Sequence, residues 1–239
     1  MDKKEALKIV KKDGLKLKNL PAQFKKDKKI VFEALKSFFF IVLKYADKSL
    51  MKDKEFILEM VNEDMGAIEY ADNILKNDKD FIIEVIKING FALKHVDEIF
   101  RKDKEIVLEA VKQDGGALKY VDDSLKKDKE VVLAAINNKG YPLDYADYSF
   151  KKNKKIVLKA VKQDGGALKY ADDSLKKNKE IVLEAVKQNG NSLEYADDSL
   201  KKNKKIVLEA VKEDGNSLEY ADDSLKNDPD ILAMVNKKK

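Results

Sequence analysis

The sequence has few of the side chains that usually carry out reactions. Cysteine is absent, His95 is the only histidine and Arg101 is the only arginine in 239 residues. Without cysteine there is no disulfide framework, thiol nucleophile or thiolate metal site. A general base needs a positioned partner and a metal site needs several ligands, so one histidine predicts neither. No phosphate-binding glycine loop, nucleophile elbow or HExxH pattern is present either. We therefore expect no enzyme, no cofactor and no metal centre.

Long apolar runs are also absent. The longest, residues 38–43, is far shorter than the roughly 18 residues that cross a bilayer. The first eight residues contain three lysines and lack the apolar centre of a secretory signal. We expect a cytoplasmic protein that makes no membrane contact. Export by a signal-free route leaves no such trace, so that alternative stays open.

What the sequence has instead is self-similarity. A pattern of about 25 residues returns from one end of the chain to the other, and a fixed period of this size indicates one structural unit stacked on the next. The 49 basic and 44 acidic residues are interspersed and nearly cancel, which is typical of a solvated surface. A single repeat has too few apolar side chains to offset its loss of conformational entropy, so neighbouring repeats must share one core.

The unit at residues 103–127 shows how each repeat is built. Asp103 stands before an apolar cluster that ends at Asp114-Gly115, which predicts a capped helix of about ten residues. The capping position carries Asp or Asn throughout: Asp2, Asp27, Asp53, Asp78, Asp103, Asp128, Asn153, Asn178, Asn203 and Asp228. The glycines at the other end predict a left-handed helix stop.

The second half of the unit places Leu118, Val121 and Leu125 on one stripe, which predicts a second helix of two turns. Asn191 and Asn216 are interpreted as its caps, and Pro142 as its first residue. The tyrosine column (Tyr45, Tyr70, Tyr120, Tyr145, Tyr170, Tyr195 and Tyr220), in which His95 takes one place, is predicted to belong to the core.

These patterns predict an all-α solenoid of about nine to ten stacked αα-hairpins, with ten first helices and nine second helices. We expect one elongated domain over residues 1–239. It comprises divergent repeats at 1–44, regular repeats at 45–227, and a capping helix with a lysine tail at 228–239. Pro21 is expected to break the second helix of the first repeat, and an insertion near residues 38–40 shifts the repeats that follow.

The unit resembles the short repeat of the domain of unknown function 4116 family. The string from residue 168 to residue 190, LKYADDSLKKNKEIVLEAVKQNG, carries this resemblance. It covers residues 45–235 well and residues 1–44 loosely, and His95 and residues 38–40 depart from it. The resemblance implies helical repeats of a kind found often in bacterial proteins, with no assigned reaction.

Four aromatic residues interrupt the repeat pattern. Phe91 and Tyr141 stand where other repeats have Gly or Asn, Tyr148 stands where they have Asp, and Phe40 lies in the irregular segment. Exposed aromatic side chains often mark interfaces. We take these four residues as candidates for partner binding, and the alternative is that they fill gaps between imperfect repeats.

Lysines cluster where one repeat passes into the next. Stacking would align them into a basic edge made of Lys151, Lys152, Lys154, Lys155, Lys201, Lys202, Lys204 and Lys205. Such a ribbon can follow phosphates, but an acidic stripe (Asp122-Asp123 and its equivalents) runs alongside. Arginine and interleaved aromatics are also missing. We therefore predict a monomeric scaffold or inhibitor/effector-type binder that contacts another protein, with nucleic-acid binding through the lysines as the alternative.

Overall fold

The computed structural model describes residues 1–37, 39–138 and 142–236, without the side chains of residues 39 and 40. α-Helices and 3-10 helices are the regular elements in these ranges, and the described residues contain no strand. The chain divides into two compact units, Met1–Gln113 and Asp114–Lys239, which are described separately below. The predicted all-α repeat class is confirmed, while the single domain over residues 1–239 stays a prediction.

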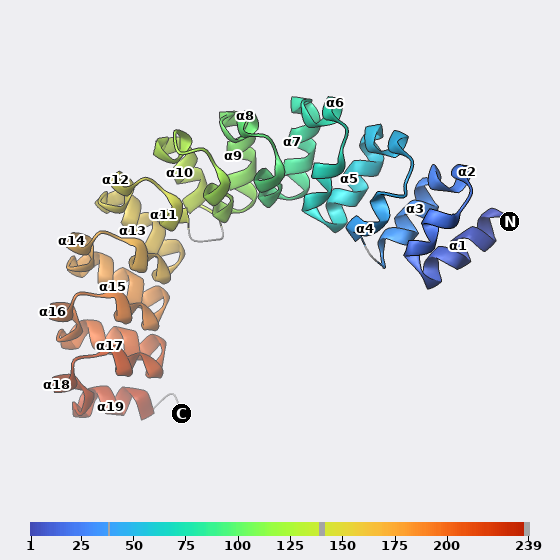
Figure 1. The fold of residues 1–239 in the computed structure, drawn as a ribbon. Helices are drawn as coiled ribbons and strands as arrows, with labels where there is room; N and C mark the ends of the chain where they lie inside the picture. Colours follow the sequence, from blue (N-terminus) through green and yellow to red (C-terminus); the bar gives the residue numbers. More distant parts are fainter. Residues whose placement is uncertain (38, 139–141, 237–239) are drawn as a thin grey trace. The chain divides into compact units, whose positions relative to one another are not determined.

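Each repeat of unit 1 begins with its longest helix, called helix A here (Figure 1). The A helices of unit 1 are α1 (Lys3–Lys12), α3 (Lys28–Leu35), α5 (Lys54–Glu63), α7 (Lys79–Ile88) and α9 (Lys104–Gln113). The connecting elements are η1 (Gly14–Asn19), α2 (Ala22–Lys25), α4 (Phe39–Leu43), η2 (Lys48–Lys52), η3 (Met65–Tyr70), α6 (Asn73–Lys76), η4 (Gly90–His95) and α8 (Glu98–Arg101).

Unit 2 repeats the same order more regularly. Its A helices are α10 (Lys129–Ile136), α13 (Lys154–Gln163), α15 (Lys179–Gln188), α17 (Lys204–Glu213) and α19 (Pro229–Asn236). The connecting elements are η5 (Gly115–Tyr120), η6 (Leu125–Lys127), α11 (Pro142–Tyr145), α12 (Tyr148–Lys151), η7 (Gly165–Tyr170), α14 (Asp173–Lys176), η8 (Gly190–Tyr195), α16 (Asp198–Lys201), η9 (Gly215–Tyr220) and α18 (Asp223–Lys226). The ten predicted A helices are thus all present among the described residues.

The A helices begin where their capping residues predict. The Asn178 side chain accepts hydrogen bonds from the backbone N–H groups of Glu180 and Ile181, and Asp53 accepts one from Phe56. Pro229 is the first residue of α19, a position where the missing proline N–H costs nothing. Each cap satisfies an amide that has no partner within its own helix.

The second half of the repeat differs from the predicted two-turn helix. In most repeats it is a 3-10 helix followed by a separate one-turn helix, such as η7 and α14, with extended backbone at Ala171 and Asp172 between them. The 3-10 helices are capped by Asn189 and Asp214, so the interpretation of Asn191 and Asn216 as caps is wrong. Pro142 does begin α11, and Pro21 lies at the corresponding break between η1 and α2.

This break has a structural cause, because the backbone there bonds to the preceding repeat. The Asp172 N–H donates to the Lys151 carbonyl at 2.9 Å, and the Asp197 N–H donates to the Lys176 carbonyl at 3.1 Å. Equivalent bonds join Asp222 to Lys201, Asp147 to Lys126, Asp72 to Met51 and Asp47 to Lys25. In these six repeats one backbone N–H group thus bonds to the preceding repeat and not within its own helix.

The core is shared between neighbouring repeats. In α15 the fully buried residues are Ile181, Val182, Ala185 and Val186, and this helix contacts α13, α17, η7 and η8. Contacts between consecutive A helices also join α7 to α9 and α17 to α19. Helix A is therefore the centre of the core, as its apolar residues predict.

Five of the glycines at the ends of the A helices do not adopt the predicted left-handed conformation. Gly14, Gly90, Gly165, Gly190 and Gly215 all lack a positive φ angle. Most of them permit close approach instead, because a Cβ atom at Gly90 would lie 2.6 Å from the Ala110 carbonyl oxygen of the next repeat. The same clash with the next repeat's alanine carbonyl occurs at Gly14, Gly165 and Gly190.

Candidate functional site

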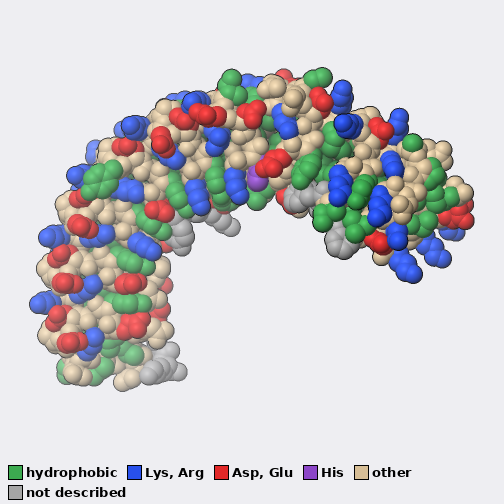
Figure 2. Space-filling view, viewed as in Figure 1, with side chains coloured by type: hydrophobic (Ala, Val, Ile, Leu, Met, Phe, Trp, Pro, Cys, Tyr) green, Lys and Arg blue, Asp and Glu red, His purple; other side chains and the backbone are tan. Residues whose placement is uncertain are grey.

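Several lysines of the predicted basic edge form ion pairs with carboxylates. Lys154 pairs with Glu180 at 2.6 Å, and Lys204 pairs with Asp228 at 2.8 Å and Asp230 at 2.6 Å. Lys202 and Lys201 lie 3.8 and 3.5 Å from Asp222 and Asp198. Lys151 donates to the Asp144 carbonyl, Lys152 lies over the Tyr148 ring, and Lys155 and Lys205 are exposed. On the visible face, acidic and basic side chains alternate over the repeats of unit 2 (Figure 2).

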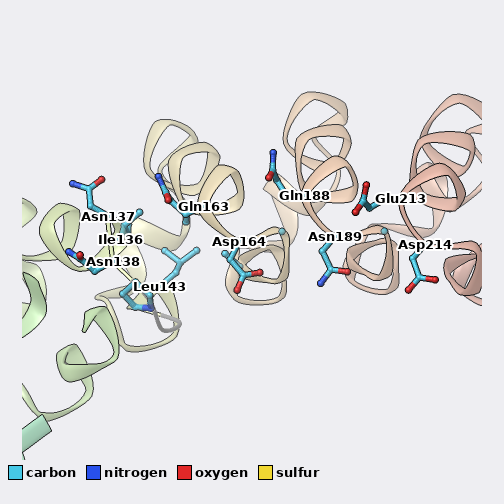
Figure 3. Close-up of a pocket in the computed structure, with 15 residues that line it drawn as sticks. Ile136, Asn137, Asn138, Leu143, Gln163, Asp164, Gln188, Asn189, Glu213 and Asp214 are labelled. Atoms are coloured by element: carbon cyan, nitrogen blue, oxygen red, sulfur yellow. The ribbon is translucent and has the colours of Figure 1, made fainter. Parts of the chain in front are cut away.

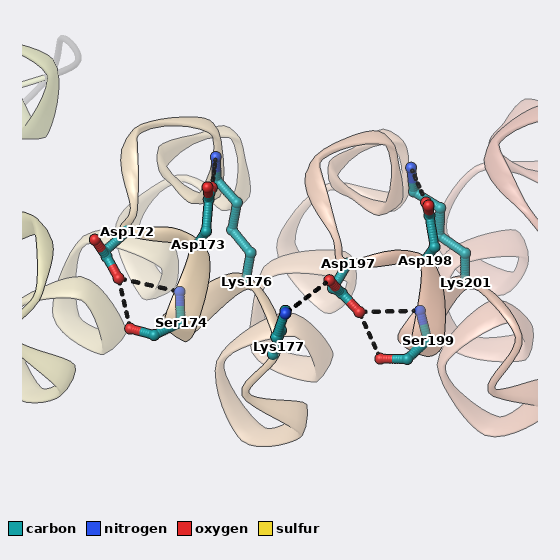
Figure 4. Close-up of polar contacts among 9 residues, drawn as sticks. All are labelled: Asp172, Asp173, Ser174, Lys176, Lys177, Asp197, Asp198, Ser199 and Lys201. Carbon is teal, nitrogen blue, oxygen red and sulfur yellow. Dashed lines mark hydrogen bonds and ion pairs between the residues drawn. The ribbon is translucent and has the colours of Figure 1, made fainter.

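The paired aspartates have two separate roles (Figure 4). Asp172 and Asp197 each accept hydrogen bonds from the N–H and hydroxyl groups of the serine two residues later, which caps the one-turn helix. Asp173, whose side chain is 92% exposed, pairs instead with Lys176. The acidic stripe is therefore a set of helix caps and solvated ion pairs, and the two carboxylates of each aspartate pair contact different partners.

Asp172 shows how strongly these caps hold the charged form of the carboxyl. The Ser174 hydroxyl, the Tyr148 hydroxyl and the Ser174 N–H all donate to it and lower its pKa to about 2. The same contact raises the pKa of Tyr148. A hydrogen bond to a charged form favours that form.

Of the four candidate aromatics, two can be placed. Tyr148 is 57% exposed and lies between Asp172 and Lys152, whose ammonium group is 4.8 Å from the ring centre. Phe91 is half-buried in η4. The Phe40 side chain and all of Tyr141 lie outside the described residues, and Phe91 and Tyr148 belong to different units.

The tyrosine column is not part of the core as predicted. Six of its members are half-buried, and Tyr70 is 38% exposed. Lysines lie over several rings, with Lys169 at 5.8 and 5.9 Å from the rings of Tyr170 and Tyr195, a geometry typical of cation–π contact. His95 takes the same position and contacts Glu69 through Nδ1. The described residues hold no cluster of three or more side chains that could bind a metal ion.

A large hollow lies in unit 2, at the carboxyl ends of its A helices. It has a volume of about 790 Å³ and is open to solvent. Two parallel rows of polar side chains line it in Figure 3: Gln163, Gln188 and Glu213 at the ends of α13, α15 and α17, and Asp164, Asn189 and Asp214 one residue later. Ile136, Pro142 and Leu143 form an apolar end. We call this hollow the carboxyl-end groove.

A smaller depression of about 300 Å³ adjoins the groove and shares Asn189 with it. It lies over η7 and η8, between the Tyr170 and Tyr195 side chains, and is also lined by Lys169, Asn191 and Glu194. The half-buried tyrosines are therefore part of the surface beside the groove.

The sequence analysis did not predict the groove. Its signal is the polar pair before each glycine, Gln163-Asp164, Gln188-Asn189 and Glu213-Asp214, which recurs every 25 residues. The pair was interpreted only as the end of a helix. The second residue does cap the next 3-10 helix, since Asp164 accepts from the Gly166 N–H at 2.8 Å, but the first residue is exposed beside the groove.

The repeat family is shown by a comparison with family models. The model for the domain of unknown function DUF4116 matches residues 2–51, 53–101, 103–151, 153–201 and 203–235. The chain belongs to the DUF4116 family. Each complete DUF4116 match spans two of the 25-residue repeats, and the first match starts at residue 2, so it includes nearly all of the segment 1–44 in which only a loose resemblance was expected. No curated protein and no solved structure matches the chain. Among the described helices of this DUF4116 protein, none has the length and apolar character to cross a membrane.

Proposed function

We propose that this DUF4116 chain is a non-catalytic binding module, a scaffold or inhibitor/effector-type binder, that holds part of another protein in the carboxyl-end groove. One observation carries the proposal: three consecutive repeats present matched polar side chains along one hollow of about 790 Å³. Polar groups repeated along a groove suit a chain-like ligand, since each repeat can contact the next part of the same molecule. A monomeric, cytoplasmic protein fits the cysteine-free sequence.

The partner is expected to be a protein because the basic edge is interleaved with carboxylates. Lys154, Lys202 and Lys204 each face at least one acidic side chain. Phosphate tracking needs uncompensated positive charge along the path of the backbone. Nucleic-acid binding through these lysines is therefore the weaker alternative, and salt-dependent retention of the chain on generic duplex DNA would favour it.

The proposal is tested by selecting displayed random peptides against the full chain. Gln163 and Gln188 are both exposed, so the double variant Q163W/Q188W obstructs the groove without disturbing the core. Lys12 and Glu63 occupy the same repeat positions in unit 1, and K12W/E63W is the matched control. We expect selected peptides to lose binding to Q163W/Q188W and to keep it with K12W/E63W. Peptides that bind all three proteins equally, or no selectable peptide at all, would overturn the proposal.

A further inference from the structure

The polar rows of the groove have a spacing that fits an extended polypeptide. Neighbouring packed helices lie about 8–10 Å apart, and three residues of extended chain span about 10 Å. Successive repeats therefore contact ligand residues that are about three positions apart in the ligand's sequence. Gln163, Gln188 and Asn189 carry amides that both donate and accept, so they can pair with main-chain N–H and C=O groups as well as with side chains.

The described lining residues of the groove carry a net negative charge. Asp164, Glu213 and Asp214 line the groove, and no lysine or arginine is among its described lining residues. The carboxyl ends of α13, α15 and α17 add the negative ends of their helix dipoles. Lys162, Lys187 and Lys212 directly precede Gln163, Gln188 and Glu213 in the sequence and are exposed. They do not line the groove, so they weaken its negative electrostatic potential without contacting its interior.

Two hydrogen-bond acceptors lie unpaired next to the groove. Ser192 is fully buried, and its hydroxyl oxygen has no partner among the described residues. The Ser192 Oγ lies 2.8 Å from the position that a Cβ atom would occupy at Gly165, and Gly165 lines the groove. Asn191 donates through Nδ2 to Asp214 at 2.9 Å, but its buried Oδ1 accepts nothing. Buried polar atoms normally have partners, so the two unpaired acceptors are unusual, although neither residue lines the groove itself.

We infer that the occupant of the carboxyl-end groove is an extended segment of a partner protein that carries two lysine or arginine residues about six positions apart, because Asp164 lies in the first of the three repeats, Glu213 and Asp214 lie in the third, and the middle repeat is neutral. The inference rests on the proposed function and adds the chemistry and spacing of the partner. The ammonium or guanidinium groups pair with Asp164, Glu213 and Asp214, while the amides hold the main chain. An anionic ligand such as a nucleic acid would be repelled by the same carboxylates.

The chain itself supplies charge-only variants that keep the fold. Asn89 and Asn189 cap 3-10 helices at the repeat position that Asp164 and Asp214 occupy in their own repeats. The repeat position of Glu213 is occupied by glutamine in two other repeats, at Gln163 and Gln188. The variant D164N/E213Q/D214N therefore removes three charges and keeps each cap. The matched control D13N/E63Q/D64N makes the same three changes at the same repeat positions in unit 1.

The experiment measures fluorescence anisotropy of labelled peptides of about 12 residues, the length that crosses the three repeats. One probe has two lysines six residues apart among serines, a second has glutamine in place of both lysines, and a third has its two lysines consecutive. With the full chain, we expect the spaced lysine probe to bind at least about tenfold tighter than the glutamine probe, with the preference shrinking from about 50 to about 300 mM salt. We expect D164N/E213Q/D214N to lose about tenfold in affinity and the control less than about twofold.

Three results would overturn the inference: equal binding of the lysine and glutamine probes, equal losses in the two triple variants, or equal binding of the spaced and consecutive lysine probes. Its failure is distinguishable from failure of the proposed function. If selected peptides depend on the groove but are not basic, the proposed function stands and this inference falls. If no selected peptide is lost with Q163W/Q188W, both fall.

Discussion

At the scale of single residues, the glycines show that the same residue at the same repeat position can be required in one repeat and not in another. Gly90 and Gly215 occupy the same repeat position, and neither needs a positive φ angle. A Cβ atom at Gly90 would meet the Ala110 carbonyl oxygen at 2.6 Å, whereas at Gly215 the nearest atom is the Val235 Cγ1 at 3.6 Å. The requirement is therefore set by the neighbouring repeat.

This difference predicts that the same substitution, glycine to alanine, changes the free energy of unfolding by different amounts at the two positions. We expect Gly90→Ala to lower the free energy of unfolding by about 1–3 kcal/mol, because the backbone of the next repeat must move. Gly215→Ala should change it by less than about 1 kcal/mol, or raise it, because alanine reduces the entropy of the unfolded chain. Urea denaturation followed by circular dichroism measures both, and equal losses would contradict this account.

At the scale of the element, the aspartate caps combine two functions that substitution can separate. Asp103 accepts hydrogen bonds from the N–H groups of Glu105 and Ile106 at the start of α9, and it pairs with Lys79 of the preceding repeat at 2.7 Å. Asn153, Asn178 and Asn203 cap their helices without a carboxylate. Capping thus needs only the side-chain oxygen.

We expect Asp103→Ala to lower the free energy of unfolding by about 1–2 kcal/mol, since the cap is lost. Asp103→Asn should cost less than about 1 kcal/mol, because it keeps the cap and removes only a solvent-exposed ion pair. Thermal and urea denaturation of the two variants provide the comparison. If asparagine costs as much as alanine, the ion pair and not the cap stabilises α9.

The caps also predict how stability depends on pH. Hydrogen bonding to Lys28 lowers the pKa of Asp53, hydrogen bonding to Lys204 lowers that of Asp228, and the Ser174 and Tyr148 hydroxyls lower that of Asp172 to about 2. A carboxyl whose pKa is lower in the folded state binds fewer protons there than in the unfolded chain. The stabilising effect of such a carboxyl is complete above its pKa in the unfolded chain, and it disappears as the pH falls through its pKa in the folded protein.

We therefore expect the free energy of unfolding to be steady from pH 7 to about pH 5 and to fall continuously towards about pH 2. Urea titrations at a series of pH values measure this fall. The variant D172N should show a shallower fall, because asparagine does not titrate. A free energy of unfolding that is unchanged at low pH would show that these carboxylates do not stabilise the fold.

At the scale of the whole molecule, repetition makes neighbouring repeats interchangeable. Gly165 approaches the Ala185 carbonyl, and Gly190 approaches the Ala210 carbonyl in the same way. Removing residues 178–202 would place α17 against α13 with the same four buried apolar residues, because Ile206, Val207, Ala210 and Val211 would replace Ile181, Val182, Ala185 and Val186. A stack of this kind loses one interface per deleted repeat and keeps the others.

We expect the deletion of residues 178–202 to give a folded protein with unchanged helicity per residue and a lower free energy of unfolding. The deletion of residues 178–189, about half a period, should not fold, because it joins unmatched halves of two repeats. Circular dichroism and urea denaturation distinguish the two chains. An unfolded 178–202 deletion would show that long-range contacts beyond neighbouring repeats are required.

The sequence by itself determined the period, the all-helical class and the A helices, because these depend on local capping and apolar spacing. It also contained a signal that was missed: the first aspartate in Asp172-Asp173-Ser174 is a cap, so a new helix starts there. The same local chemistry fixes the ends of most elements, which explains why prediction succeeds at this level.

Only the tertiary structure decided how the second half of the repeat is divided, how exposed the tyrosines are and where the groove lies. The Asp172 N–H leaves its own helix because the Lys151 carbonyl of the preceding repeat is available to it. The groove exists because Gln163, Gln188 and Glu213, 25 residues apart in sequence, become neighbours when α13, α15 and α17 stack. A periodic sequence states what recurs, but the packing of one repeat on the next decides which recurring residues face each other.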